Sequence, residues 1–218
     1  MLNSRKTITI SAIIIASITL SGCTASENST SSSKTESTAA FTASPTTGEK
    51  VDTTGLDLKG NEAHQKLLEV LAYSEKTATN SGYVETNSAN GQENIFIYSP
   101  AEQKAFAYDV TGGQKMGLDD KTMLSVFGIK GFTEYFKNKM SYTLKDNIFT
   151  IEVASTKQSA VIYVKDGLIV KTEQVEDGTT ASVSDMVYSL SDAELVMINE
   201  ILNQPPHAHD SSGNDVAQ

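Results

Sequence analysis

Beyond residue 54, apolar residues recur at helical spacing in three regions of the chain, and the first of these is the clearest. The predicted buried face of this region, residues 61–79, consists of Ala63, Leu67, Val70, Leu71, Ser74 and Ala78. The spacing predicts an amphipathic helix with Asn61 at its N-cap, and Gly82 is expected to end it.

Alternation of apolar and polar residues predicts a first antiparallel hairpin after this helix. Its strands are residues 95–98 and 105–108, joined by a polar stretch that contains Pro100. Shorter strands are expected on either side of the hairpin, around residues 83–86 and 115–118.

The turns of two later hairpins are visible in the sequence. Asp146-Asn147 forms the tip of a hairpin over residues 141–153. Asp166-Gly167 supplies the positive φ angles of a type I′ turn in the hairpin over residues 160–175. Asp177-Gly178 is a second turn of this kind, and it leads into the last strand.

Two further helical regions complete the pattern. The pattern of residues 119–139 predicts two short helices, with a break around Gly128 and Gly131. Ser191 and Glu194 form a capping box that opens a last helix, which Pro205 stops. The residues expected on the apolar face of that helix are Leu195, Ile198 and Leu202. This order of elements predicts an α+β domain with a single antiparallel sheet covered by a few helices.

The N-terminus has the three-part layout of a secretory signal peptide. A basic start at Arg5 and Lys6 precedes an uncharged run over residues 8–20, which is too short for a membrane span. The stretch LSGC then resembles the lipobox of bacterial lipoproteins, which implies a signal peptide over residues 1–22 and a diacylglycerol on Cys23. The alternative is an ordinary signal peptide with a chance cysteine near its end.

Composition divides the rest of the chain. Residues 23–54 are rich in Ser and Thr, and they predict a disordered tether that follows the lipidated cysteine. The folded, ligand-binding domain is assigned to residues 55–204, and the polar residues 205–218 are expected to be a disordered tail. The formal charge of −10 disfavours nucleic acid as a partner, because phosphates need clustered Lys and Arg.

The sequence carries no recognisable catalytic motif, so we predict a protein that is not an enzyme and uses no cofactor. Cys23 is the only cysteine, and lipid on its thiol would remove thiol chemistry from the domain. His64 is expected to be an ordinary helical histidine. His207 and His209 are the most metal-like pair, but they lie in a polar tail after two prolines, and no metal site is predicted.

Aromatic residues, and strands that are apolar on both faces, supply the candidate ligand site. Aromatic residues of the first hairpin share a parity, others crowd the central helices, and the strands around residues 161–164 and 168–170 are apolar at both parities. Strands of that kind are covered on both faces, by helices or by a ligand or partner. The candidate pocket residues are Phe96, Tyr98, Phe106, Tyr108, Phe127, Phe132, Tyr135, Phe136, Leu168 and Val170. The alternative is that they form an ordinary core.

The arrangement of lipobox, tether, amphipathic helix, hairpins, central helices and the late hairpin YVKDGLIVKTEQV resembles the LppX/LprG lipoprotein family and the broader LolA-like superfamily. The late VYSLSD also resembles the closing strand of those domains. The resemblance implies a curved sheet, a half-barrel covered by helices, with a cavity that carries a lipid or acylated glycolipid. It implies no catalytic residues.

Two functions remain open on these grounds. The first is a lipid-anchored carrier on the extracytoplasmic face of the bacterial cell membrane, which binds a lipid or other hydrophobic ligand. The second is an interaction module with a closed core, which docks another envelope protein through an exposed apolar patch. An extracytoplasmic enzyme is the least favoured alternative.

Overall fold

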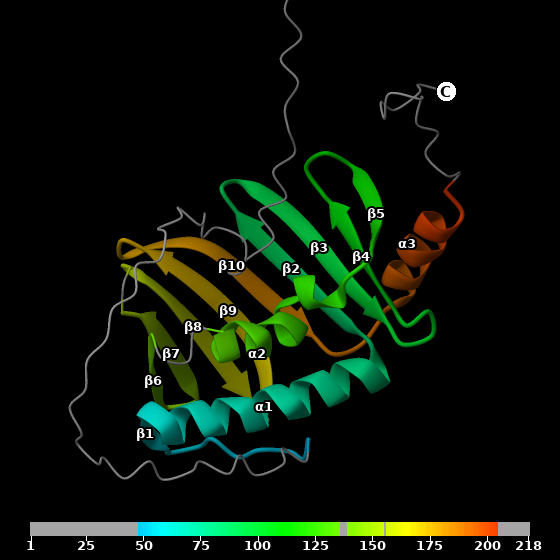
Figure 1. The fold of residues 1–218 in the computed structure, drawn as a ribbon. Helices are drawn as coiled ribbons and strands as arrows, with labels where there is room; N and C mark the ends of the chain where they lie inside the picture. Colours follow the sequence, from blue (N-terminus) through cyan, green and yellow to red (C-terminus); the bar gives the residue numbers. More distant parts are fainter. Residues whose placement is uncertain (1–47, 136–138, 155, 205–218) are drawn as a thin grey trace, which may run out of the picture.

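The computed structural model describes residues 48–135, 139–154 and 156–204, and these fold around one ten-stranded antiparallel sheet (Figure 1). Its strands are β1 (Asp57–Lys59), β2 (Tyr83–Ala89), β3 (Gln92–Ser99), β4 (Lys104–Asp109), β5 (Gln114–Leu118), β6 (Met140–Lys145), β7 (Ile148–Val153), β8 (Gln158–Lys165), β9 (Leu168–Glu176) and β10 (Thr179–Val187). The helices are α1 (Gly60–Ser81), α2 (Ser125–Tyr135) and α3 (Asp192–Leu202), with a 3-10 turn, η1 (Lys121–Met123), before α2. The α+β class predicted from the sequence is confirmed.

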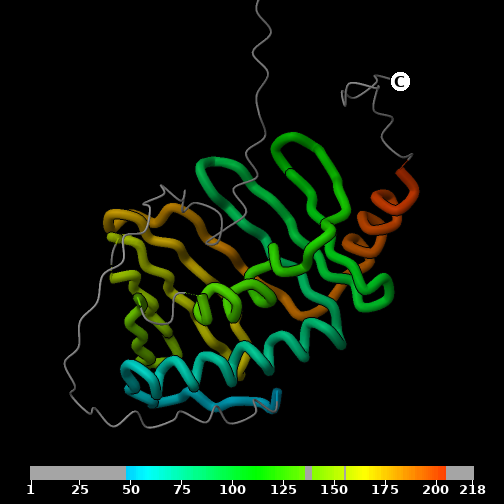
Figure 2. The backbone as a smooth tube through the Cα atoms, in the orientation of Figure 1, coloured from blue at the N-terminus to red at the C-terminus, as the bar shows by residue number. Residues whose placement is uncertain are grey.

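Two meanders make the sheet. The strand order is β1-β6-β7-β8-β9-β10-β2-β3-β4-β5, so the pairing of β10 with β2 joins the meander β2–β5 to the meander β6–β10. Strands β1 and β5 lie at opposite ends of this order, and the sheet stays open. Figure 2 shows α1 running along one end of the strands, with α2 in front of the middle of the sheet. We call the face that α1 and α2 cover the concave face, and the opposite face, which carries α3, the convex face.

Helix α1 buries the face that the sequence predicts, namely Ala63, Leu67, Val70, Leu71, Ser74 and Ala78. The predicted N-cap is wrong, because Lys59 occupies that position and Asn61 is exposed in the first turn. Strand β1 runs straight into the helix, which leaves no room for a separate capping residue. Gly82 ends the helix as expected, with φ of 86°.

The turn predictions are confirmed by the backbone angles. Both residues of each predicted turn have positive φ: 51° and 66° at Asp146-Asn147, 55° and 81° at Asp166-Gly167, and 50° and 78° at Asp177-Gly178. These angles match type I′ turns, whose twist suits antiparallel strands. Each turn lies between paired neighbours, β6–β7, β8–β9 and β9–β10.

The central helical region breaks at another position than predicted. Gly128 and Gly131 both lie inside α2, and the break falls at Leu124, whose N–H donates to the Lys121 carbonyl at the end of η1. A glycine inside a helix costs about 1 kcal/mol relative to alanine. Burial of Leu124, Val126, Phe127 and Ile129 outweighs that cost.

Helix α3 packs on the convex face, where Ile198 and Ile201 contact Ile97 and Phe106. The capping box of Ser191 and Glu194 is confirmed. The predicted apolar face is wrong in part, because the buried stripe is centred between Ile198 and Ile201, whereas Leu195 and Leu202 remain exposed.

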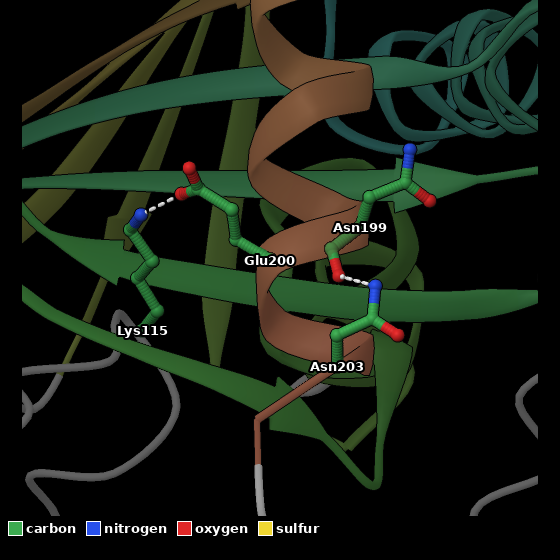
Figure 3. Close-up of polar contacts among 4 residues, drawn as sticks. All are labelled: Lys115, Asn199, Glu200 and Asn203. Atoms are coloured by element: carbon green, nitrogen blue, oxygen red, sulfur yellow. Dashed lines mark hydrogen bonds and ion pairs between the residues drawn. The ribbon is translucent and has the colours of Figure 1, made fainter.

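Polar contacts also hold α3 in place, as Figure 3 shows. Lys115 of β5 pairs with Glu200, and the Asn203 side-chain amide donates to the Asn199 carbonyl at 2.8 Å. The first contact ties the helix to the edge strand β5, and the second closes its last turn.

Residues 48–54 pack on the domain, although composition groups them with the tether. Thr53 is buried, and its hydroxyl donates to the Asn147 side-chain oxygen at 2.7 Å. A Cβ added to Gly167 would lie 2.8 Å from the Val51 carbonyl oxygen, so this segment also presses on the β8–β9 turn. It leads into β1, a strand that the sequence pattern does not predict.

Candidate functional site: the concave face of the sheet

Strand register decides which side chains share the concave face, because directly paired residues point to the same side of an antiparallel sheet. The row beside α1 consists of Tyr83, Tyr98, Ala105 and Leu118. The next row consists of Met186, Glu85, Phe96, Ala107 and Met116. Apart from Glu85, these residues belong to one core cluster with the buried faces of α1 and α2. The concave face is therefore apolar where the helices cover it.

A cluster of aromatic residues links α2 to these two rows of the concave face. The Phe127 ring lies 5.1 Å from the Tyr98 ring and 6.2 Å from the Tyr83 ring, and Tyr83 meets Tyr188 edge-on at 5.6 Å. The Lys121 ammonium lies 4.9 Å from the Phe127 ring centre. Edge-on and tilted aromatic contacts of this kind add to the stabilisation that burial gives.

A buried carboxylate also anchors α2. Glu85 is only 2 % exposed, and its Oε1 accepts a hydrogen bond from the Ser125 hydroxyl at 2.7 Å. Its Oε2 accepts from the Ser125 backbone N–H at 2.9 Å and from the Tyr83 hydroxyl at 2.8 Å. Ser125 is the first residue of α2, so a negative charge here also suits the helix dipole.

Two buried tyrosines remain neutral hydrogen-bond donors around this carboxylate. Burial, reinforced by the neighbouring Glu85 charge, raises the pKa of Tyr83 well above its usual range. Burial likewise raises the pKa of Tyr188, whose hydroxyl donates to the Ile169 carbonyl at 2.7 Å. The Ile169 N–H donates in turn to the Ser74 hydroxyl of α1 at 3.1 Å, so these contacts tie α1 to β9.

Burial on the concave face declines with distance from α1. Leu67 of α1 and Ile169 beneath it have no exposed surface, whereas Asn94, Gln174 and Ser182, on the same face toward the other end of the strands, are half-buried. The concave face is thus sealed under α1, and it retains access to solvent toward the other end of the strands.

The predicted pocket residues of the first hairpin divide between the two faces. Phe96 and Tyr98 lie on the concave face, but Phe106 pairs with Ile97 and Tyr108 pairs with Ile95, which places both on the convex face beside α3. The expectation that all four line one site is therefore wrong. The four-residue connection pairs even-numbered residues of β3 with odd-numbered residues of β4, so equal parity means opposite faces.

The remaining candidates are scattered. Phe127 lies on the concave face, Phe132 is half-buried, and Tyr135 is mostly exposed at the end of α2. Leu168 and Val170 flank the fully buried Ile169 and are themselves half-buried. Val170 is the extra residue of a bulge between the pairs Tyr163–Lys171 and Val164–Ile169. Phe136 lies outside the described residues, as do Cys23, His207 and His209.

His64 is held as a half-buried neutral ring. It stacks on Tyr142 of β6 with ring centres 4.4 Å apart, and its buried Nε2 makes no hydrogen bond to a described residue. Burial lowers the pKa of His64, although the Glu134 carboxylate partly opposes that shift. The ring therefore contributes packing in its uncharged form.

Other features of the described residues bear on function as follows. They hold no group of three or more His, Cys, Asp or Glu side chains placed to bind a metal ion. Among them, no helix is both long and apolar enough to cross a membrane. A surface groove of about 360 Å³ with a polar lining lies where residues 50–54 meet Asn147, Asp166 and Gly167.

No protein-family model matches the chain, and no curated protein matches it significantly.

Sequence reasoning missed the residues that hold the site together, namely Tyr83, Glu85, Ser125 and Tyr188. One signal was present, because Glu85 has the same parity as Tyr83 in the segment YVETNSA. A carboxylate on the buried side of a strand needs hydrogen-bond partners. Its partner Ser125 lies 40 positions away, and only the fold brings the two together.

Proposed function

We propose that this protein is a membrane-tethered extracytoplasmic lipoprotein that binds a lipid or another hydrophobic ligand on the concave face of its sheet. The observation that carries the proposal is the apolar surface under α1 and α2, which leads into half-buried residues toward the other end of the strands. An apolar surface that borders a more exposed part of the same face is suited to an apolar ligand. The proposed activity is binding, and Glu85 and Ser125 have a structural role, because together they hold α2 on the sheet.

The fold supports the likeness to LolA-like and LppX/LprG carriers. In those families a curved antiparallel sheet is covered by helices on its concave side. Here, one open sheet of ten strands carries α1 and α2 on one face. The proposed ligand lies on this face beside α2, next to the contact of Phe127 with Tyr98.

The N-terminal sequence supports the membrane attachment. The lipobox-like LSGC would place two acyl chains on Cys23, and each buried methylene contributes about 0.8 kcal/mol to anchoring. Residues 23–47 would then connect that anchor to Gly48, where the described domain begins.

A hydrophobic dye tests the binding. The chain from residue 23 onward with Cys23→Ser keeps every described residue and can be titrated with N-phenyl-1-naphthylamine. We expect saturable dye binding, which Ala89→Phe weakens by obstructing the concave face. Ala193→Phe on exposed helix α3 is the matched control and should bind as the parent does. The proposal fails if no dye binds and native mass spectrometry finds no co-purified lipid.

A second candidate function is favoured by the exposed apolar residues of α3. Val196 is 56 % exposed, and Leu195 and Leu202 beside it are also exposed, as is Val187 at the end of β10. Exposed apolar side chains that lie together mark candidate protein–protein contacts. This surface would suit an envelope protein as a partner of the tethered domain.

Site-specific crosslinking tests this second function. A photo-crosslinking residue at Val196 should give one discrete adduct in the cell envelope, and the same residue at exposed Glu176 should not. The adduct should disappear in a Leu195→Ser, Leu202→Ser variant that folds normally. Identical crosslinking from both positions would exclude α3 as a specific docking surface.

A further inference from the structure

One row of paired residues crosses the convex face from β6 to β5. Each member pairs directly with the next, so all of their side chains point to the same side of the sheet. We call it the long row, and in order it consists of Lys145, Ile148, Tyr163, Lys171, Asp185, Thr86, Ile95, Tyr108 and Lys115. Asp185 of β10 is its middle member.

Helix α3 covers only one half of the long row. Ile95 packs with the core cluster under α3, and Lys115 pairs with Glu200 of the helix. Figure 1 shows α3 beside β4 and β5, away from β7 and β8. We call the opposite part of the long row, over β6–β9, the bare end; its residues are Lys145, Ile148, Tyr163 and Lys171.

The bare end is apolar at its centre. Ile148 and Tyr163 are half-buried, and neither belongs to a core cluster of the described residues. The same is true of Val161 and Val183 in the adjoining row on this face. This half of the convex face is thus an apolar surface that the described helices leave uncovered, and such surfaces mark interaction sites.

The outer side of α3 has a matching pattern of charge. Asp192, Val196 and Glu200 are all exposed and follow one another at i, i+4 and i+8, so two acids flank an apolar residue along about 12 Å of helix. The helix contains no Lys or Arg.

The bare end has the opposite charges at a similar spacing. Lys171 and Lys145 flank its two apolar residues, and three strand spacings separate the lysines by about 14 Å. Lys171 also pairs with Glu173, and Glu200 with Lys115, but these side chains keep exposed surface for further contacts. The outer side of α3 and the bare end are therefore complementary in charge, apolar centre and length.

We propose that the convex face is the interface between two copies of this chain, with α3 of each copy seated on the bare end of the other. Figure 3 shows α3 running across the strands behind it, which is the direction of the long row. A twofold axis over β10, parallel to the strands, therefore places α3 on the other half of the same row. Glu200 then lies near the partner's Lys145, and Asp192 near the partner's Lys171. The contact occurs twice, as in any twofold dimer.

The rest of the molecule is compatible with this dimer. Gly48 lies against Ala72 and Lys76 of α1, so the chain that precedes it begins away from the convex face. The inference does not depend on ligand binding, because the concave face stays outside the interface. It does occupy the α3 surface that the second candidate function assigns to an envelope protein. Each contact involves one face of a helix about 16 Å long, so we expect a weak, reversible dimer.

Disulfide crosslinking tests the arrangement, because the Cys23→Ser chain contains no cysteine. A mixture of Val196→Cys and Tyr163→Cys chains should give a covalent dimer under mild oxidation. Neither variant should do so alone, because the axis keeps identical positions apart. Glu176→Cys, exposed at the end of β9, is the matched control and should not link to Val196→Cys. No adduct from the first mixture, or equal adducts from every combination, would overturn the proposal.

Sedimentation equilibrium of the Cys23→Ser chain tests the association itself. The parent should dimerise reversibly as its concentration rises toward millimolar. Lys145→Glu should raise the dissociation constant about three- to tenfold, since each dimer contains the contact twice. Lys130→Glu, exposed on α2 at the concave face, is the matched control and should leave the constant unchanged. A parent that stays monomeric would overturn the dimer and leave α3 to an envelope partner. Parental dimerisation of Lys145→Glu would overturn the assigned interface.

Discussion

The carboxylate of Glu85 accepts both the backbone N–H and the hydroxyl of Ser125, so one buried side chain of β2 holds the first residue of α2. A hydrogen bond to a charged group contributes about 1.5–3 kcal/mol. Glu85→Gln keeps the shape but places an amide NH₂ group among donors. We expect its free energy of unfolding to fall by about that amount in urea denaturation. Glu93→Gln on the exposed end of β3 should change it by less than about 0.5 kcal/mol.

Ser125→Ala separates the two bonds that Glu85 makes with this residue. It removes the hydroxyl and keeps the backbone N–H, so it should cost about 1 kcal/mol and less than Glu85→Gln. If the two variants lost equal stability, the backbone contact would contribute nothing and the anchoring of α2 would rest on the hydroxyl alone.

The stacking of His64 on Tyr142 gives a pH dependence whose sign follows from burial. Because burial lowers the pKa of His64 below 6.5, the folded state binds fewer protons than the unfolded state in the range below that value. Stability from this residue is therefore complete above about pH 6.5 and is lost as the pH falls through the lowered pKa. His64→Phe should lose less stability than the parent between about pH 7 and pH 5, measured by urea midpoints. The groups facing the ring include Glu134, and Glu134→Gln should enlarge the effect by removing its opposing charge.

Tyr142 gives the opposite dependence at high pH. Burial raises its pKa to about 12, so the folded state keeps a proton that the unfolded state releases near pH 10. Stability is therefore lost as the pH rises above about 10. Tyr142→Phe should reduce that loss, and ultraviolet titration of the folded protein should show one tyrosinate fewer near pH 12 than the parent. A parental titration curve for this variant would show that Tyr142 ionises outside that range.

Two glycines in the same kind of turn report on the docking of residues 48–54. Gly167 and Gly178 each follow an aspartate and have φ near 80°, so alanine should strain both turns. Only at Gly167 would the new Cβ meet Val51, since nothing lies within 4 Å at Gly178. We expect Gly167→Ala to cost about 1 kcal/mol more than Gly178→Ala. Trypsin should also cleave after Lys50 faster in Gly167→Ala, whereas equal cleavage in both variants would contradict the docking.

The sequence predicts the elements of this fold well where an element depends only on residues close together in the chain. The buried face of α1 and the Asp-Gly turns follow from spacing and from residues that tolerate positive φ. The faces of the sheet do not follow in this way, because one connection of even length reverses the parity relation between Phe96 and Phe106. Likewise, Glu85 acquires its role from Ser125, a contact that depends on where α2 packs. The class of the fold was thus predictable from sequence, whereas the composition of the candidate site depended on register.

Register also makes Phe96 and Phe106 a test of which face binds ligand. Both are nearly fully buried, Phe96 on the concave face and Phe106 under α3, so Phe→Leu at either position should cost a similar amount, about 1 kcal/mol. Only Phe96→Leu changes the surface beside Phe127 that is proposed to contact ligand. We therefore expect Phe96→Leu to weaken binding of the hydrophobic dye several-fold and Phe106→Leu to leave it unchanged, both measured by fluorescence titration. The reverse result, with dye binding sensitive to Phe106 alone, would move the ligand to the convex face beside α3.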